Sequence, residues 1–403
     1  MDFKEIKRIC ERNTVLSARV IDDFLLYYAA ERDKLEPEMV RRFARFKHIT
    51  GKFQKEWIAR LKAQYISHKI FRHDGLIKGY LNHVALKKLG TEERNYLEIQ
   101  AASPWRFSFS VIRGRLAEDF FEMEDVFTDE RYLLYSPGMT RILDSQPAIL
   151  WLNLIAYNGS CWQSYGPIGS YSSFEPDDVF FFATELNHDI TGEEELLADL
   201  ESNPVPYMML LSGATTPLIY NKKDQLVHVT AEYPMDSMNT KILTRSFKTE
   251  FNDGVYRLSL KRWSIPPHFA QAYYNEIEKT VLLTSMTDRG FTALAKELNK
   301  YGYTFSTDPL LRVNLSMLTI SSDILKRNIR INEYDDLFTK ETPQSDQKVI
   351  DKLNRFMELV VPEINAGRQP DIDELALKAG LDKQTALDIF NHLKGRIDKM
   401  GNK

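Results

Sequence analysis

Seven Lys and Arg residues between positions 41 and 69 recur at spacings that would align them on helix faces. Arg41 and Arg45 are one helical turn apart, and Lys55, Lys62 and Lys69 repeat every seven residues. Aligned cations of this kind attract the phosphates of a polyanion, and the affinity then falls steeply with salt. The sequence therefore predicts a polyanion-binding surface, here named the basic stripe, made of Arg41, Arg42, Arg45, Lys52, Lys55, Lys62 and Lys69.

Two other interpretations of the basic stripe remain open. From 41 to 88 the chain has 13 basic residues against only Glu56 and Asp74, so the stripe could be a solvated face. It could also dock internally on an acidic stretch of the middle of the chain, which holds Glu118, Asp119, Glu122, Glu124, Asp125, Asp129 and Glu130. The interleaved aromatics, such as Phe43 and Trp57, fall in the apolar phase, and we expect them in the core rather than on bases.

A second candidate lies near the C-terminal end of the chain. Residues 372–391 place a small Ala376 where two helices would cross, Gly380 at a tight turn, and Leu375 and Leu381 in the seam. This segment resembles the helix-turn-helix unit of DNA-binding regulators, which implies that Lys383, Gln384 and Thr385 lead the helix that would enter the major groove. Residues 345–403 have no net charge, so we expect mainly a packing or protein-docking role for this unit.

Motifs for catalysis are weak in this chain. The tetrapeptide Gly159-Ser160-Cys161-Trp162 resembles the nucleophile segment of papain-like cysteine proteases, but Ile155 stands where that family needs Gln. We therefore expect Cys161 to be a structural residue on a β-strand, just after the Asn158-Gly159 turn. The pair His73-Asp74 resembles the metal-binding pair of HD-type phosphohydrolases, without the later helical aspartate that the family requires. We predict no catalytic residue, no metal site and no cofactor.

Composition places the chain among ordinary globular proteins. It has 403 residues, of which 43% are hydrophobic and 27% charged, and a net charge of −4. The charge is uneven, since residues 1–100 carry +7 and residues 101–344 carry −11. Two cysteines cannot build a disulfide framework, the first residues contain no apolar signal segment, and no apolar run would span a membrane. We expect a cytoplasmic protein.

Apolar residues recur every three or four positions up to residue 101, which predicts four or five helices. The first should run from about 17 to 32, another should start at Pro37 and carry Val40 inward, and a third should present Phe53 and Tyr65 on one face. A fourth should end at Gly90.

From Pro104 the pattern changes to alternation with many β-branched and aromatic residues, which favours strands. Hairpins are predicted at Asn158-Gly159, at Asn252-Asp253-Gly254 and at Asn221–Asp224, and a strand at 280–285 should precede a helix at 287–301. The polar segment 333–345 reads as a linker, followed by helices near 346–361, 371–379 and 383–398.

The resulting fold class is α+β and multidomain: a helical domain at 1–101 with a basic face, an acidic and mainly antiparallel domain at 102–332, and a trihelical unit at 346–403. For function, we expect a non-catalytic binding or interaction protein that contacts nucleic acid, or another protein, through the basic N-terminal helices. The alternative is an enzyme whose site is assembled from scattered residues of the middle domain.

Overall fold

The computed structural model describes residues 2–84, 86–330, 332–338, 352, 355–356, 359–360, 363, 370–387 and 390. The chain forms two compact units, residues 1–334 and residues 335–403. Among the described residues the architecture is α+β, as the sequence predicts. No helix in these ranges is long and apolar enough to cross a membrane.

Helices fill the first hundred residues, as the apolar periodicity predicts. They are α1 Phe3–Ser17, a π-helical stretch η1 Ala18–Leu25, α2 Leu26–Arg32, α3 Leu35–Ala44, α4 Lys47–Thr50, α5 Lys55–Phe71, α6 Ile77–Leu81, the short η2 Leu86–Lys88 and α7 Thr91–Ala102. Two expectations need correction. Helix begins at Phe3 rather than near residue 17, because Asp2 caps α1 by accepting from the backbone of Lys4 at 3.0 Å. Val40 is 48% exposed instead of facing inward.

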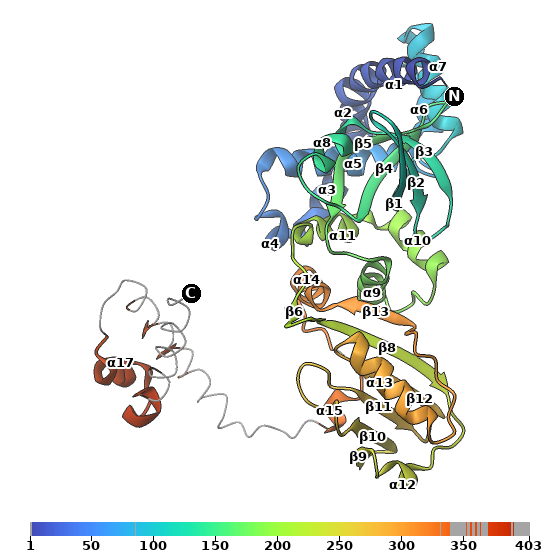
Figure 1. Ribbon diagram of the computed structural model, residues 1–403. Helices are drawn as coiled ribbons and strands as arrows, with labels where there is room; N and C mark the ends of the chain where they lie inside the picture. The colour runs from blue at the N-terminus through green and yellow to red at the C-terminus, as the bar shows by residue number, and fades with distance from the viewer. Residues whose placement is uncertain are drawn as a thin grey trace. The chain divides into compact units, whose positions relative to one another are not determined.

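The strands that follow close into a five-stranded barrel (Figure 1). They are β1 Arg106–Ala117, β2 Phe120–Asp125, β3 Arg131–Tyr135, β4 Leu150–Tyr157 and β5 Trp162–Tyr171, in the order β1-β2-β3-β5-β4, with helix α8 Pro137–Leu143 between β3 and β4. β1 is long enough to pair with β2 through its second half and with β4 through its first half. β3 and β5 pair in parallel, and the other pairs are antiparallel.

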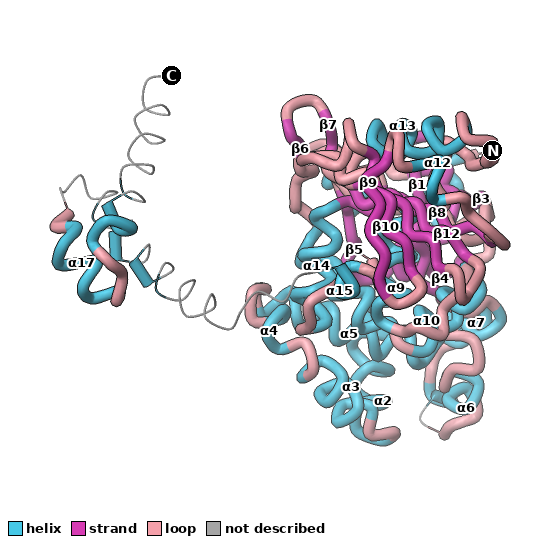
Figure 2. Tube along the Cα trace, turned by 90° about the horizontal axis from the view of Figure 1, so that it is seen from below, coloured by secondary structure: helices cyan, strands magenta, loops and turns pink. Residues whose placement is uncertain are grey.

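A six-stranded antiparallel sheet forms the other half of the first unit (Figures 1 and 2). Its order is β13-β8-β12-β11-β10-β9, with bounds β8 Val227–Pro234, β9 Phe247–Asn252, β10 Val255–Leu260, β11 Gln271–Asn275, β12 Thr280–Ser285 and β13 Leu311–Asn314. Helix α13 Asp288–Asn299 packs on β8 and β12 over an apolar core. The predicted strand at 280–285 is confirmed, and the predicted helix at 287–301 is confirmed to within two residues at its end.

All three predicted hairpins form. The Asn158-Gly159 turn joins β4 to β5, and the Asp253-Gly254 turn joins β9 to β10 with positive φ at both residues. The third joins the two-residue strands β6 Tyr220–Asn221 and β7 Asp224–Gln225. Two details differ from the prediction. The segment before β9 is helical, as α12 Thr240–Leu243, and Cys161 is the last residue of its turn rather than a strand residue.

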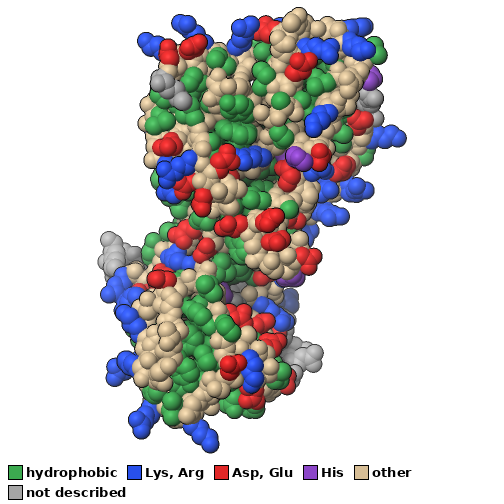
Figure 3. Space-filling view, turned by 90° about the vertical axis from the view of Figure 1, so that its right-hand side faces the viewer, with side chains coloured by type: hydrophobic (Ala, Val, Ile, Leu, Met, Phe, Trp, Pro, Cys, Tyr) green, Lys and Arg blue, Asp and Glu red, His purple; other side chains and the backbone are tan. Residues whose placement is uncertain are grey.

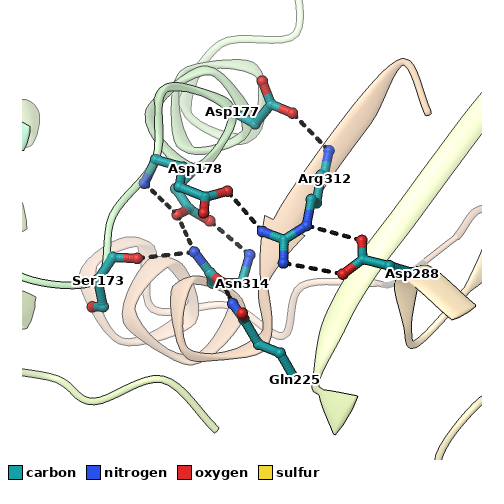
Figure 4. A network of polar contacts seen from close by, with 8 residues as sticks. Ser173, Asp177, Asp178, Gln225, Asp288, Arg312 and Asn314 are labelled. Carbon is teal, nitrogen blue, oxygen red and sulfur yellow. Dashed lines mark hydrogen bonds and ion pairs between the residues drawn. The ribbon is translucent and has the colours of Figure 1, made fainter. Parts of the chain in front are cut away.

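The two halves of the first unit are joined by helices and a polar network around β13. The helices are α9 Pro176–Leu186, α10 Glu193–Ser202, α11 Pro204–Met209, the short η3 Leu210–Gly213 and α14 Leu315–Leu325. Figure 4 shows Asp177 and Asp178, at the start of α9, facing Arg312 and Asn314 of β13. Asp178 accepts from the Asn314 backbone at 2.7 Å and from its side chain at 2.6 Å, and the Arg312 guanidinium reaches Asp288 of α13 at 2.9 Å.

One hydrophobic core runs through the N-terminal helices, the barrel and α14. It contains Leu97 of α7 and Trp105 directly before β1, and it extends to Ile324. The predicted domain boundary at 101/102 therefore lies inside this shared core. Most residues of the basic stripe lie on α3 and α5, and packing in this core holds both helices in place.

The second unit contains α15 Asp335–Phe338 and α17 Ile372–Ala379. Of the predicted linker, Tyr334 is buried and stacks on Tyr273 with ring centroids 5.4 Å apart, while residues 339–345 lie outside the described residues. Helix α17 ends at Gly380, which has a φ of 72°, as the helix-turn-helix comparison implies. A small core holds Phe356, Val360, Ala376, Ala379 and Ala386. The helices predicted near 346–361 and 383–398 lie mostly outside the described residues.

Candidate functional site

The structure divides the basic stripe into two groups according to their partners. Arg41 and Arg42 lie on α3 and Arg45 follows it, whereas Lys55, Lys62 and Lys69 lie on α5, with Lys52 just before that helix. Arg42, Lys52 and Lys69 make internal contacts. Arg41, Arg45, Lys55 and Lys62 have no ion pair or side-chain hydrogen bond among the described residues, and we call these four the outer stripe.

Glu38 of α3 is the point at which the two helices of the basic stripe meet. Its carboxylate accepts from Arg42 at 3.0 Å and lies 3.4 Å from the ammonium group of Lys69. The hydroxyl of Tyr65 also donates to it, at 2.9 Å. Burial raises the pKa of Glu38, but these partners outweigh burial and leave that pKa below its usual value. Burial also lowers the pKa of Lys69. Both groups are therefore structural and hold α3 against α5.

Lys52 also has a partner within the protein. Its ammonium group lies 2.5 Å from the carboxylate of Asp323 on α14, and His48 contacts the Asp323 carbonyl at 2.8 Å. These contacts border an open hollow of about 770 Å³ between the N-terminal helices and α14. Part of the basic stripe therefore contacts Glu38 of α3 and Asp323 of α14, which lie outside the acidic stretch of residues 118–130.

In the acidic stretch of residues 118–130, Glu118 and Glu124 pair with cations outside the basic stripe. Lys7 of α1 lies 3.4 Å from Glu118, and Glu124 pairs with Arg113 and with Arg131. Hydrogen bonds from both arginines lower the pKa of Glu124 to about 2. On the side of the molecule shown in Figure 3, acidic side chains gather across the middle, and many of the basic ones stand toward the edges. The outer stripe therefore stays available to an external anion.

Helix α1 packs on the outside of the barrel, at one end of β2 and β3. Here Phe3, Ile6 and Cys10 of α1 pack against Phe120 and Tyr135, with the Phe3 and Phe120 rings 5.1 Å apart. Helix α1 therefore covers the barrel where β2 begins and β3 ends.

Cys161 lies in the same contact and not in a catalytic setting. Its sulfur is 3.5 Å from that of Cys10, and both thiols are buried. The amide of Asn158 donates to Cys10 Sγ at 3.2 Å, while its carbonyl oxygen accepts from the Cys161 backbone at 2.8 Å. The hydrogen bond with Cys161, together with burial, raises the pKa of the Cys10 thiol. No helix begins at Cys161 and no histidine contacts it among the described residues, unlike in papain-like proteases.

A cavity of about 260 Å³ lies beside this contact, between η1, α7 and β5. Asp22 of the π-helical stretch projects toward it and accepts from the hydroxyl of Tyr165. Burial raises the pKa of Asp22. π-Helical stretches occur often at functional sites. Sequence patterns could not identify this cavity, because its walls come from segments more than a hundred residues apart.

In the helix-turn-helix-like unit, Lys383 is paired rather than free. Its ammonium group lies 2.5 Å from the Asp373 carboxylate of α17. Gln384 is exposed, and the backbone of Thr385 donates to the side chain of Asp382 at 2.9 Å. Residues 388, 389 and 391 of the segment lie outside the described residues. Lys383 is thus the one cation among the three side chains that would lead a recognition helix, and Asp373 already pairs with it.

Comparison with protein-family models, with curated proteins and with solved structures gives no match. The described residues also contain no group of three or more His, Cys, Asp or Glu side chains arranged to hold a metal ion.

Proposed function

We propose that the protein is a binding protein for a phosphate-rich polyanion, with nucleic acid as the ligand class, and that the outer stripe contacts its backbone. The supporting observation is that Arg41, Arg45, Lys55 and Lys62 have no internal anionic partner, although the cations beside them do. Glu38, which pairs with both Arg42 and Lys69, holds α3 against α5, the helices that carry or adjoin the four cations.

Binding of this kind is non-catalytic and depends on salt. Each phosphate that a cation neutralises contributes about −0.9 to the slope of log affinity against log salt on duplex DNA. The outer stripe supplies up to four such contacts. Arg41, Arg45 and Lys55 are exposed and Lys62 is half-buried, and none of the four has a polar partner among the described residues, so their replacement should leave the fold intact.

The test is charge reversal at the outer stripe, with Arg41, Arg45, Lys55 and Lys62 all changed to Glu. We expect the variant to lose retention on heparin and affinity for duplex DNA at low salt, with the salt slope reduced by about 0.9 for each lost contact. The matched control reverses four exposed lysines elsewhere, Lys4, Lys222, Lys223 and Lys279, none of which has an ion-pair partner among the described residues.

The control has the same net charge as the test variant and should retain most of the wild-type affinity. Lys383→Ala should also bind normally, because that side chain is already paired with Asp373. If the test variant and the charge-matched control lost the same affinity for nucleic acid, binding would depend only on net charge. That result would refute the proposal. So would a wild-type protein that binds no nucleic acid at any salt concentration.

The competing function is an enzyme or small-molecule binder that uses the cavity beside η1. The observation in its favour is Asp22, whose pKa burial raises, inside a cavity lined by Tyr96 and Tyr165. Small-molecule thermal-shift screening of wild type and Asp22→Asn distinguishes the two functions. Ligands that stabilise only the wild type would favour the cavity.

A further inference from the structure

A second concentration of positive charge lies on the six-stranded half of the first unit, where no sequence pattern indicates one. A hollow of about 600 Å³ opens between the segment after α12, the end of β10 and the outer side of α13. We call it the basic groove. Its cationic lining residues are Arg245, Lys261, Arg262, Lys296 and Lys300.

The charge of the basic groove opposes that of its surroundings. Residues 101–344 carry −11 overall, yet five cations line the groove against the single carboxylate of Glu297. That carboxylate is already engaged, since Lys300 lies 2.6 Å from it and Ser246 donates to it at 2.6 Å. Hydrogen bonds from these partners lower the pKa of Glu297. A hollow lined by one sign of charge focuses its field and concentrates counterions.

Among the described residues, four of these cations have no ion-pair partner, and three of the four make no side-chain hydrogen bond either. Lys261 is held by the carbonyl oxygens of Thr244 at 2.8 Å and Arg245 at 3.2 Å. Arg245, Arg262 and Lys296 have no side-chain hydrogen bond or ion pair among the described residues. They come from a loop, the end of a strand and a helix, so only the fold brings them together. Like charges gathered in this way repel one another, and a bound anion would relieve that repulsion.

Trp263 supplies an aromatic wall beside these cations. Its ring contacts Arg289, whose guanidinium carbon lies 5.4 Å from the ring centroid, and the ring of His268 in a T-shaped arrangement with centroids 4.3 Å apart. The side chain is partly exposed and lines the hollow. Proteins that bind single strands combine a basic groove for the backbone with an aromatic ring on which a base stacks.

We propose that the basic groove binds single-stranded nucleic acid, with backbone phosphates on Arg245, Arg262 and Lys296 and a base against Trp263. A hollow of about 600 Å³ is in the size range that encloses a small ligand, which suits a nucleotide of a flexible strand rather than a stiff duplex. The groove shares no residue with the outer stripe, so this inference does not rest on the proposed function.

The experiment measures fluorescence anisotropy of a labelled twelve-nucleotide oligothymidylate. The starting protein carries the outer-stripe reversal, so that failure of the proposed function and failure of the groove give different results. In that background, changing Arg245, Arg262 and Lys296 to Glu should weaken binding at least tenfold. The matched control changes Lys222, Lys223 and Lys279, three exposed lysines of the same half, to Glu, and should stay within threefold. Melting curves confirm that each variant is folded.

Trp263 distinguishes a strand from a free phosphate. Trp263→Leu should weaken oligothymidylate binding about tenfold, Trp263→Phe should restore most of it, and neither should change binding of pyrophosphate. The inference is overturned if the groove reversal weakens binding no more than its control. It is also overturned if pyrophosphate or a mononucleotide binds to the groove while the oligonucleotide does not.

Discussion

His228 and Asp178 are buried titratable side chains whose pKa values shift in opposite senses. Burial lowers the pKa of His228 from 6.5 to about 4, and its Nε2 contacts only the hydroxyl of Thr284, at 3.1 Å. Burial raises the pKa of Asp178 from 3.8 to about 6, despite three N–H donors. Stability from His228 is complete above pH 6.5 and is lost as the pH falls toward 4. Stability from Asp178 is greatest below pH 3.8 and is lost as the pH rises through 6.

The two effects offset each other in the wild-type protein, so a single variant is needed to separate them. We expect His228→Gln, which keeps a hydrogen-bonding group near Thr284, to remove the histidine contribution. Between pH 6.5 and pH 4 the unfolding free energy of the wild type should then fall by about 3 kcal/mol more than that of the variant. Urea unfolding at several pH values measures this difference. Parallel pH profiles for the two proteins would show that His228 does not titrate in this range.

The β4–β5 turn is the element that fixes α1 on the barrel, and one side chain organises it. The carbonyl oxygen of Asn158 accepts from the backbones of Ser160 at 2.9 Å and Cys161 at 2.8 Å. Its amide donates to Gln163 at 2.8 Å and to Cys10 Sγ at 3.2 Å. The side chain thus closes the turn and reaches α1 at the same time.

We expect Asn158→Ala to destabilise the protein by about 2 to 4 kcal/mol, because buried donors in the turn would lose their acceptor. Asn82→Ala is the control, since that exposed side chain makes only one contact, to the Lys78 carbonyl at 3.3 Å, and should cost less than about 0.5 kcal/mol. Chemical unfolding monitored by tryptophan fluorescence gives both values. Similar losses in the two variants would mean that the turn does not depend on Asn158.

Elements with local signals could be predicted from the sequence, and elements that depend on distant pairing could not. Asn158-Gly159 and Asp253-Gly254 define their turns within a few residues, and 280–285 alternates as a strand should. Closure of the barrel depends on the parallel pairing of Leu134 with Trp162, for which no short pattern exists. The site follows the same rule. The cations of α3 and α5 are visible as a repeat, but the basic groove exists only once residues 245 to 300 are folded together.

At the scale of the whole molecule, the chain divides into the unit of residues 1–334 and the unit of residues 335–403. The polar composition of 333–345 and Pro343 predict a linker, while Tyr334 is already buried in the first unit. We expect limited trypsin treatment to cut first after Lys340 and to release two folded pieces, identified by mass spectrometry and circular dichroism. A first cut inside residues 1–334 would contradict a linker at this position.

The contact between Cys10 and Cys161 spans 151 positions of the chain, and this separation affects how the protein is made. A ribosome adds about 5 to 20 residues per second, so α1 emerges roughly 8 to 30 seconds before the turn that receives it. During that interval the apolar side chains Phe3 and Ile6 have no barrel to cover them. Helix α1 therefore cannot complete its contact with the β4–β5 turn until residue 161 has been synthesised.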